Sequence, residues 1–209
     1  MPPAEPIQRG AMSELSRRTF LASTAGLFAS TSCSTPIQGR VTTASPRFER
    51  ERFVEKVKRA LPGGQKAVEE VIARAVSQPG SVIRELGSPD ERKVDLLYRD
   101  AELTIFNIVW PPDATVTPHD HLMWASIGVY AGREDNITWR RKTGTIEKIT
   151  TASVGIKEVF SLPADAIHSM TNPGENHTAA IHIYGGDLLS AKGSKWDPVT
   201  LRKVSPGGD

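Results

Sequence analysis

The sequence predicts an all-β body preceded by a pair of helices. After Pro89, short apolar stretches rich in Val, Ile, Thr, Trp and Tyr alternate with clusters of Pro, Gly and Asp, a pattern typical of strands and turns. These stretches follow one another too closely for helices to lie between them, which excludes a parallel α/β sheet. Residues 47–77 instead repeat their apolar side chains at helical spacing. We therefore expect a β-sandwich or barrel over residues 89–190 behind a helical segment over 46–88.

The helical segment divides in two at the sequence LPGG, residues 61–64. Before this break, Phe53 and Val57 recur at helical spacing, and beyond it Val68 and Ile72 do the same. The charged residues between them are expected to form the solvated face of a helix pair that packs on a larger body.

Eight stretches of the body are predicted to be strands because they combine β-branched and aromatic residues between turn signals. They are Val94–Tyr98, Leu103–Trp110, Trp124–Tyr130, Asn136–Lys142, Thr145–Thr150, Gly155–Phe160, His168–Thr171 and Ala179–Tyr184. Residues 191–209 form a C-terminal tail with one expected anchor, Trp196.

The first 45 residues are predicted to be an export signal followed by a Ser/Thr-rich linker. The pattern S-R-R-x-F-L begins at Ser16, and its paired arginines, Arg17 and Arg18, precede a short apolar stretch. That pattern resembles the twin-arginine signals that send folded proteins across a bacterial inner membrane. The apolar stretch, residues 19–29, is shorter than the roughly 20 residues of a spanning helix, so no permanent transmembrane anchor is expected. A surface helix that happens to begin with two arginines is the alternative.

Two features bear on the fate of this segment. A small-x-small cleavage site is offered by Thr42 and Ala44, while Cys33 lies in a poor lipoprotein box, so a lipid anchor is a less favoured option. We expect the mature protein to be periplasmic or secreted, with the twin-arginine machinery as a partner. Cys33 is the one cysteine of the chain, so the mature domain has no disulfide framework and no thiolate nucleophile.

The charge balance argues against a nucleic-acid partner. The 209 residues carry 26 Lys and Arg against 24 Asp and Glu, a formal net charge of +2. No basic run stands beside exposed aromatic residues in the way a nucleic-acid surface requires.

All five histidines lie in the predicted β region. His119 and His121 are one residue apart, and alternation along a strand directs both to the same face. His168, at the start of another predicted strand, can supply a third imidazole. Three protein ligands with open positions are typical of a catalytic metal, whereas a structural zinc is usually closed by four. Partly buried, hydrogen-bonded rings remain the alternative.

The last predicted strand carries His182 and Tyr184 on one face. The two side chains can line a pocket beside the metal, or they can be satisfied core residues. His177 lies in the turn NPGENH and is expected to have no role at the site.

Together, His119-x-His121, the distant His168 and the A-x-H-x-Y sequence ending at Tyr184 resemble the thiol dioxygenases of the cupin superfamily, the cysteine dioxygenase-like family. The similarity spans residues 47 to about 187. It implies a cupin jelly roll that holds Fe(II) on the three histidines and uses dioxygen to oxidise a small thiol to a sulfinate. It also implies that Tyr184, held by His182, donates a hydrogen bond to the bound oxygen or substrate.

Several positions depart from that family. Ala180 replaces the serine of its S-x-H-x-Y motif, and no cysteine lies near Ser126 to crosslink with tyrosine. Arg99 is a candidate to clamp a substrate carboxylate, although it does not occupy the family's arginine position, and a surface arginine is the alternative. Trp124 can wall the pocket or belong to the core.

Glu134, in the predicted turn GREDN, could also reach the metal. Two other functions stay open. One is a non-catalytic cupin that binds a metal or small ligand, and the other is a metal-dependent isomerase or hydrolase with Glu134 or Tyr184 as the acid–base group.

Overall fold

The computed structural model describes residues 47–204. The predicted export signal with Arg17 and Arg18, the cleavage site at Thr42 and Ala44, and Cys33 all lie outside the described residues. Among the helices that are described, none has the length and apolar character needed to cross a membrane.

The predicted helical pair is present at the N-terminal side. Its helices are α1 (Arg50–Ala60) and α2 (Gly64–Val76), joined by a 3₁₀ turn, η1 (Leu61–Gly63), at the predicted break. A third helix, α3 (Pro79–Leu86), was not predicted. Its signals are local: Pro79 occupies the first turn, where its missing N–H costs nothing, and Gly87 ends the helix at a φ of 96°.

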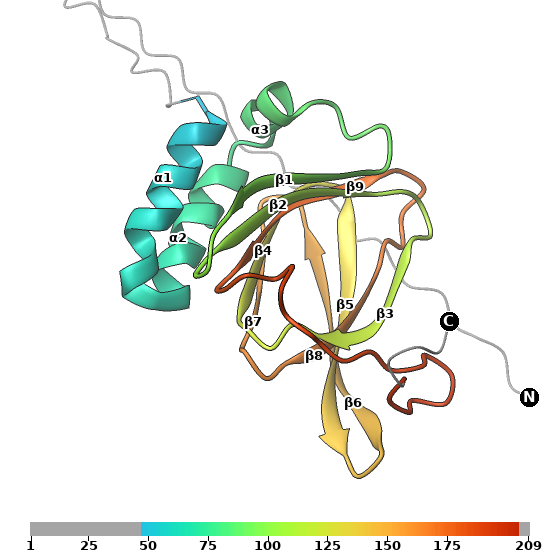
Figure 1. Cartoon of the computed structure of the whole chain (residues 1–209). Coiled ribbons are helices and arrows are strands. Elements are labelled where there is room, and N and C mark those ends of the chain that lie inside the picture. Colours follow the sequence, from blue (N-terminus) through green and yellow to red (C-terminus); the bar gives the residue numbers. More distant parts are fainter. Residues whose placement is uncertain (1–46, 205–209) are drawn as a thin grey trace, which may run out of the picture. The chain divides into compact units, whose positions relative to one another are not determined.

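Within the described residues, nine strands form two antiparallel sheets that enclose the core (Figure 1). The strands are β1 (Lys93–Arg99), β2 (Thr104–Trp110), β3 (Thr115–Asp120), β4 (Ala125–Ala131), β5 (Arg133–Lys142), β6 (Thr145–Gly155), β7 (Val159–Leu162), β8 (Ile167–Thr171) and β9 (Thr178–Tyr184). One sheet has the order β1-β2-β9-β4-β7 and the other the order β3-β8-β5-β6. Among these strands β2 pairs with β9, β3 with β8, β4 with β7 and β5 with β6. This is the strand order of a jelly roll, or double-stranded β-helix. The predicted fold class is confirmed.

One strand, β3, was not predicted, and one predicted strand is divided between two. The sequence of β3, TVTPHD, was not recognised as a strand because it is largely polar and contains Pro118. Proline is tolerated there because β3 lies at an edge of its sheet, where one side of the backbone needs no ladder partner. The predicted strand Gly155–Phe160 is instead divided by a turn between the end of β6 and the start of β7.

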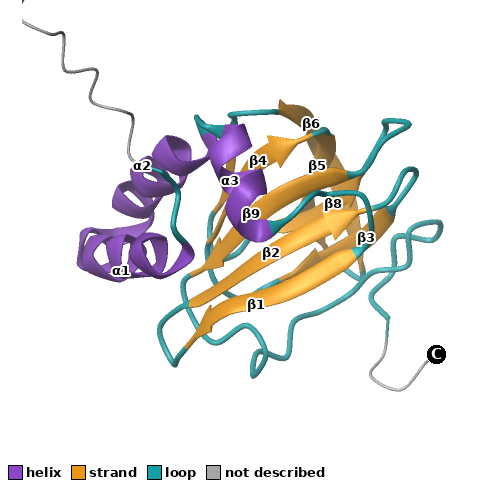
Figure 2. Ribbon diagram, turned by 90° about the horizontal axis from the view of Figure 1, so that it is seen from above, coloured by secondary structure: helices purple, strands orange, loops and turns teal. Residues whose placement is uncertain are grey.

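The helices cover the outer face of the five-stranded sheet (Figures 1 and 2). Alternation along β9 sends Ile181 and Ile183 to this face, while His182 and Tyr184 point into the barrel. Gly128 on β4 allows α2 to approach closely, because a Cβ atom there would lie 2.7 Å from Cγ1 of Ile72.

The C-terminal tail runs beside β3. Trp196 is 2% exposed and packs with Ile146 and Ile167, so the expected anchor is in place. The Trp196 amide donates to the carbonyl of Pro118 at 2.8 Å, and the Asp120 amide donates to the carbonyl of Ser194 at 3.0 Å. The tail therefore supplies backbone partners to the edge strand that carries His119.

Candidate metal centre

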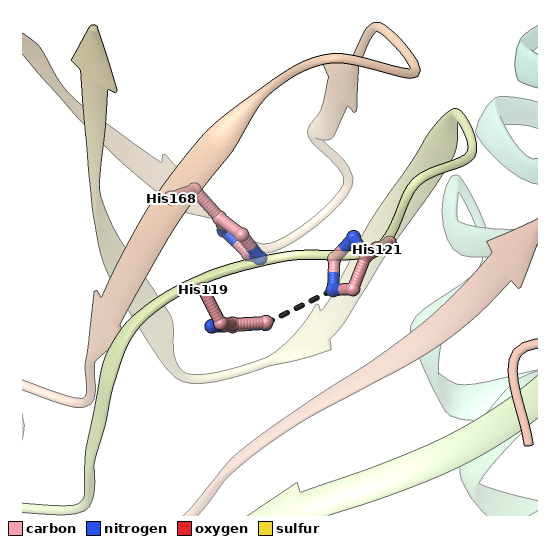
Figure 3. A group of neighbouring side chains, drawn as sticks. All are labelled: His119, His121 and His168. Atoms are coloured by element: carbon pink, nitrogen blue, oxygen red, sulfur yellow. Dashed lines mark hydrogen bonds between the residues drawn. The ribbon is translucent and has the colours of Figure 1, made fainter. Parts of the chain in front are cut away.

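Strand pairing brings the three predicted ligands together (Figure 3). His119 on β3 lies directly opposite His168 on β8, and His121 follows one residue after β3 ends. One ring nitrogen from each of the three side chains lies within 4.8 Å of the other two. Imidazole nitrogens at this mutual separation can share one metal ion.

Hydrogen bonds to backbone and amide oxygens set the orientation of two of the rings. Nδ1 of His119 donates to the carbonyl of Thr117 at 2.9 Å, and Nδ1 of His168 donates to Oδ1 of Asn136 at 3.3 Å. An oxygen acceptor requires the proton on Nδ1, so the lone pair of each ring is left on Nε2, toward the cluster. Nε2 of His119 lies 3.0 Å from Nε2 of His121.

Burial keeps these imidazoles neutral. It lowers the pKa of His121 to about 3, lowers the pKa of His119, and holds the pKa of His168 well below its usual range. Neutral imidazole is the form that binds metals, because a protonated nitrogen has no lone pair to offer. The cluster is therefore ready to accept a cation at neutral pH.

Asp120, between the two neighbouring histidines, points away from the cluster. Its carboxylate accepts from the Arg141 guanidinium at 2.8 Å and from the amide of Ser194 at 2.7 Å. These bonds anchor the segment from its opposite side and leave the two flanking rings to face inward.

A small cavity of about 50 Å³ adjoins the histidines. Its twelve lining residues come from both sheets. They are Ile108, Trp110, Val116, His119, His121, Ile127, Glu134, Asn136, His168, Met170, His182 and Tyr184. The structure thus brings five of the seven predicted site residues to one cavity.

His182 and Tyr184 form the wall opposite the predicted ligands. Nδ1 of His182 and the Tyr184 hydroxyl share a hydrogen bond of 3.3 Å, and the Tyr184 ring lies edge-on to His121 with centroids 4.9 Å apart. Burial lowers the pKa of His182 to about 3 and raises the pKa of Tyr184, so both are neutral at pH 7. A neutral phenol beside the cluster can donate a hydrogen bond to a ligand.

Glu134 enters the same cavity from β5 rather than from the predicted turn. It is fully buried, and neither carboxylate oxygen has a hydrogen-bond partner among the described residues. Burial raises its pKa to about 7, while the Asn136 side-chain amide opposes this shift; it lies close to the carboxylate without meeting hydrogen-bond geometry. Glu134 is not in the group of mutually close ligand atoms, which contains the three histidines alone among the residues described.

The other two predicted site residues lie elsewhere. The Arg99 guanidinium donates to both carboxylate oxygens of Asp187, at 2.8 and 2.9 Å, and the pair holds the pKa of Asp187 well below its usual range. Trp124 packs on Gly185 and against the cluster beneath the helices. Neither side chain lines the cavity. His177 is also outside it, as expected.

Sequence reasoning missed the partner of His168 and most of the apolar wall. Asn136 was assigned to a strand but given no role, although its spacing from Glu134 places both side chains on one face. Ile108 and Met170 were assigned to predicted strands only, because inward-facing residues of a barrel cannot be told from other core positions in the sequence.

Comparisons with known proteins give distant structural similarity only. No protein-family model and no curated protein matches the chain. An RmlC-like cupin family protein from Methanocaldococcus jannaschii is 12% identical with a TM-score of 0.41, over 49% of this chain and 88% of its own. The DMSP lyase DddQ from Ruegeria pomeroyi is 16% identical with a TM-score of 0.42, over 52% of this chain and 53% of its own. An oxalate oxidase in complex with the substrate analogue glycolate is 14% identical with a TM-score of 0.37, over 47% of this chain and 53% of its own.

The strand order identifies the fold, and the histidine cluster identifies the candidate metal site. Together they define a cupin-type double-stranded β-helix with three histidines that can hold a metal ion.

Proposed function

We propose that the protein is a metal-dependent cupin oxidoreductase that holds Fe(II) on His119, His121 and His168 and oxidises a small thiol with dioxygen. The observation that carries this proposal is the convergence of three neutral imidazoles beside a small, mostly apolar cavity. Both oxygen atoms of dioxygen end on the sulfur, which loses four electrons as the thiolate becomes a sulfinate. No further reductant is needed.

The donor set fits such a metal. Imidazole nitrogen binds iron, zinc, copper and nickel alike, and three ligands leave positions open for small molecules. Nε2 of His168 is buried without a partner among the described residues, which is costly unless a ligand completes it. When bound, Fe(II) would supply the redox chemistry that couples dioxygen to the substrate.

The chain's own residues then have three tasks. The neutral imidazoles leave the positive charge of the metal uncompensated, so the site attracts an anionic thiolate. The apolar wall, which includes Ile108 and Met170, excludes bulk water. Tyr184, hydrogen-bonded to His182, donates from its hydroxyl to the substrate or to oxygen.

We further propose that residues 1–45 direct twin-arginine export to the periplasm. Export after folding lets the protein take up its metal in the cytoplasm, away from competing copper and zinc. A reporter fused to residues 1–45 should reach the periplasm, and Arg17→Lys with Arg18→Lys should retain it in the cytoplasm. Export that needs no twin-arginine machinery would contradict this.

Oxygen uptake tests the main proposal. The domain from Gly39 onward, loaded anaerobically with Fe(II), should consume oxygen when given cysteine, cysteamine or 3-mercaptopropionate, with matching sulfinate formation. His119→Ala should abolish uptake, while His177→Ala, outside the cavity, should retain it. Full uptake by the His119→Ala protein, or none by an iron-loaded wild type across the panel, would overturn the proposal.

The buried carboxylate of Glu134 favours a second candidate, a metal-dependent isomerase or hydrolase with Glu134 as its acid–base group. A carboxyl whose pKa is raised to about 7 is suited to proton transfer at neutral pH. Turnover that persists without oxygen would identify this reaction class. Metal binding without any turnover would identify a binding protein.

A further inference from the structure

The edge strand β3, which carries His119, has little support from its own sheet. Its pairing with β8 shifts register between Val116 and His119, and Pro118 has no amide proton to donate. As an edge strand, β3 has no strand of its sheet on the other side. A metal ligand has to be held within a fraction of an ångström, so this strand needs further contacts.

The C-terminal tail makes these contacts on the free side of β3. Lys195 forms an isolated antiparallel bridge with His119, and backbone hydrogen bonds on either side of the bridge join residues 194–196 to the strand. Gly193 comes so near that a Cβ atom there would collide with the carbonyl oxygen of Asp120. The tail therefore pairs with β3 as a short additional strand, directly beside a metal ligand.

Side chains join the same two segments. The Asp120 side chain is 1% exposed. Its Oδ2 accepts from the Arg141 guanidinium of β5 at 2.8 Å, and its Oδ1 accepts from the Ser194 amide of the tail at 2.7 Å. The same guanidinium lies over the ring of Trp196, with Cζ 5.0 Å from the ring centroid, a cation–π contact. Arg141 thus contacts both Asp120 and the anchor of the tail.

These contacts bear on both neighbouring ligands. Because His119 and His121 flank Asp120 in the sequence, the backbone position of Asp120 sets the starting point of both rings. A buried carboxylate has to keep its partners, since an unpaired buried charge is costly. If Asp120 lost Arg141 or the tail, it would turn toward solvent and draw the two rings away from His168.

We propose that Arg141 and tail residues 193–196 are positioning residues for the metal centre, so that docking of the tail and binding of the metal strengthen each other. This rests on the three-histidine centre of the proposed function, but not on its reaction. Coupling between two binding events is reciprocal. The factor by which the docked tail tightens metal binding is therefore the factor by which the metal tightens docking.

The Arg141→Ala variant tests the coupling from the side of the metal. Isothermal titration should show Co(II) binding about tenfold more weakly than to wild type, and the visible absorption spectrum of bound Co(II) should change because two rings are displaced. Arg141→Lys keeps the charge beside Asp120 and should restore part of the affinity. Arg140→Ala, whose partner is Glu147 on the surface, is the matched control and should bind as wild type does. Wild-type affinity in Arg141→Ala would overturn the proposal.

The Gly193→Ala variant tests the tail without changing any charge. The added methyl group collides with β3, so Co(II) should again bind about tenfold more weakly. Gly80→Ala, where the nearest atom to a Cβ lies at 3.8 Å, is the control. Tyr130→Phe loses a hydrogen bond to Asn107 on the outer face and should lower the Tm without changing the Co(II) Kd. If Tyr130→Phe weakened Co(II) binding as much as Gly193→Ala, affinity would merely follow stability, which contradicts the proposal.

Amide hydrogen exchange in the wild type tests the reverse direction and needs no variant. The amides of Ser194 and Trp196 donate to β3. With Zn(II) bound, they should exchange about tenfold more slowly than in the metal-free protein. The Ser77 amide, at the end of α2, donates to Ala73 far from β3 and should exchange at an unchanged rate. Tail amides that do not respond to Zn(II) would overturn the proposal, whether or not the variants fold.

The outcomes separate this proposal from the proposed reaction. Weaker Co(II) binding by Arg141→Ala and Gly193→Ala, with no oxygen uptake by the iron-loaded wild type, would support the coupling and overturn thiol oxidation. Oxygen uptake by the wild type, with equal Co(II) Kd values in all three proteins, would do the reverse.

Discussion

The outer face of the five-stranded sheet and the cavity between the two sheets are both buried, but their polar groups differ in how far they are paired. On the outer face, beneath the helices, the Asn107 amide oxygen accepts from the Tyr130 hydroxyl at 2.7 Å, and the amide nitrogen donates to Asp95 at 3.2 Å. Around the cavity, Glu134, Asn136, His168 and His182 each have a buried polar atom without a partner among the described residues.

This difference separates a structural surface from a binding surface. Native proteins satisfy most buried polar atoms, so a completed pair such as Tyr130 and Asn107 is explained by the fold itself. Unpaired atoms that converge on one cavity instead indicate a ligand.

The outer face should be sensitive to volume. Gly128→Val adds a side chain at a position where even a Cβ atom would lie 2.7 Å from Ile72. We therefore expect a loss of about 3 kcal/mol in the free energy of unfolding. Gly80→Ala, with its nearest atom at 3.8 Å, should cost nothing. Urea denaturation measures both. If Gly128→Val were as stable as wild type, α2 would not pack on β4 as described. The folded Gly128→Val protein should bind metal with unchanged affinity.

The cavity wall should be sensitive to pH. In the metal-free protein the pKa of Glu134 is raised from 4.5 to about 7, so the folded state holds a proton between these values that the unfolded state has lost. Stability therefore falls as pH rises through this window, by up to about 3 kcal/mol. Glu134→Gln removes the titration and should be about 3 kcal/mol more stable than wild type at pH 8, but nearly equal at pH 4.5.

Urea denaturation in EDTA at several pH values measures this difference. The buried histidines act in the opposite direction, because His182, with a pKa of about 3, resists the proton that its unfolded form takes up below pH 6.5. They are common to both proteins and cancel in the comparison. A stability difference that is the same at every pH would contradict the raised pKa.

The hydrogen bond between Asn136 and His168 should tune metal affinity. Asn136→Ala leaves Nδ1 of His168 without its acceptor, so we expect metal to bind about tenfold to a hundredfold more weakly. Asn176→Ala, in the turn before β9 and outside the cavity, is the control. Isothermal titration with Co(II) measures both, and an unchanged affinity in Asn136→Ala would remove this residue from the site.

The hydroxyl of Tyr184 should affect turnover without affecting the metal. Tyr184→Phe keeps the ring that packs beside His121 and removes the group bonded to His182. We expect the variant to bind one metal ion per chain. Its rate of oxygen uptake should be about tenfold lower, because one hydrogen bond is lost. Steady-state oxygen uptake is the measurement. Wild-type rates would leave Tyr184 a packing residue.

Much of the fold could be predicted from the sequence because its signals are local. Helical spacing around Val57 and Ile72 identifies α1 and α2, and alternation identifies the two faces of β9. β3 escaped prediction because its edge position, which tolerates Pro118, is a property of the whole sheet.

The site was predictable in its chemistry and less so in its geometry. Histidine spacing points to three ligands, but only strand pairing places His119 opposite His168. Arg99 could not be excluded in advance, because the Asp187 that holds it lies 88 residues away. Glu134 was assigned to a turn, since GREDN has turn composition, although β5 begins at Arg133 and sends the Glu134 side chain inward.

Metal stoichiometry in histidine variants tests the central claim most directly. After anaerobic Fe(II) loading and desalting, wild type and His177→Ala should each retain one iron per chain, and His119→Ala, His121→Ala and His168→Ala should retain none. Circular dichroism would verify that each variant is folded. Stoichiometric iron in a folded His168→Ala protein would contradict the three-histidine site.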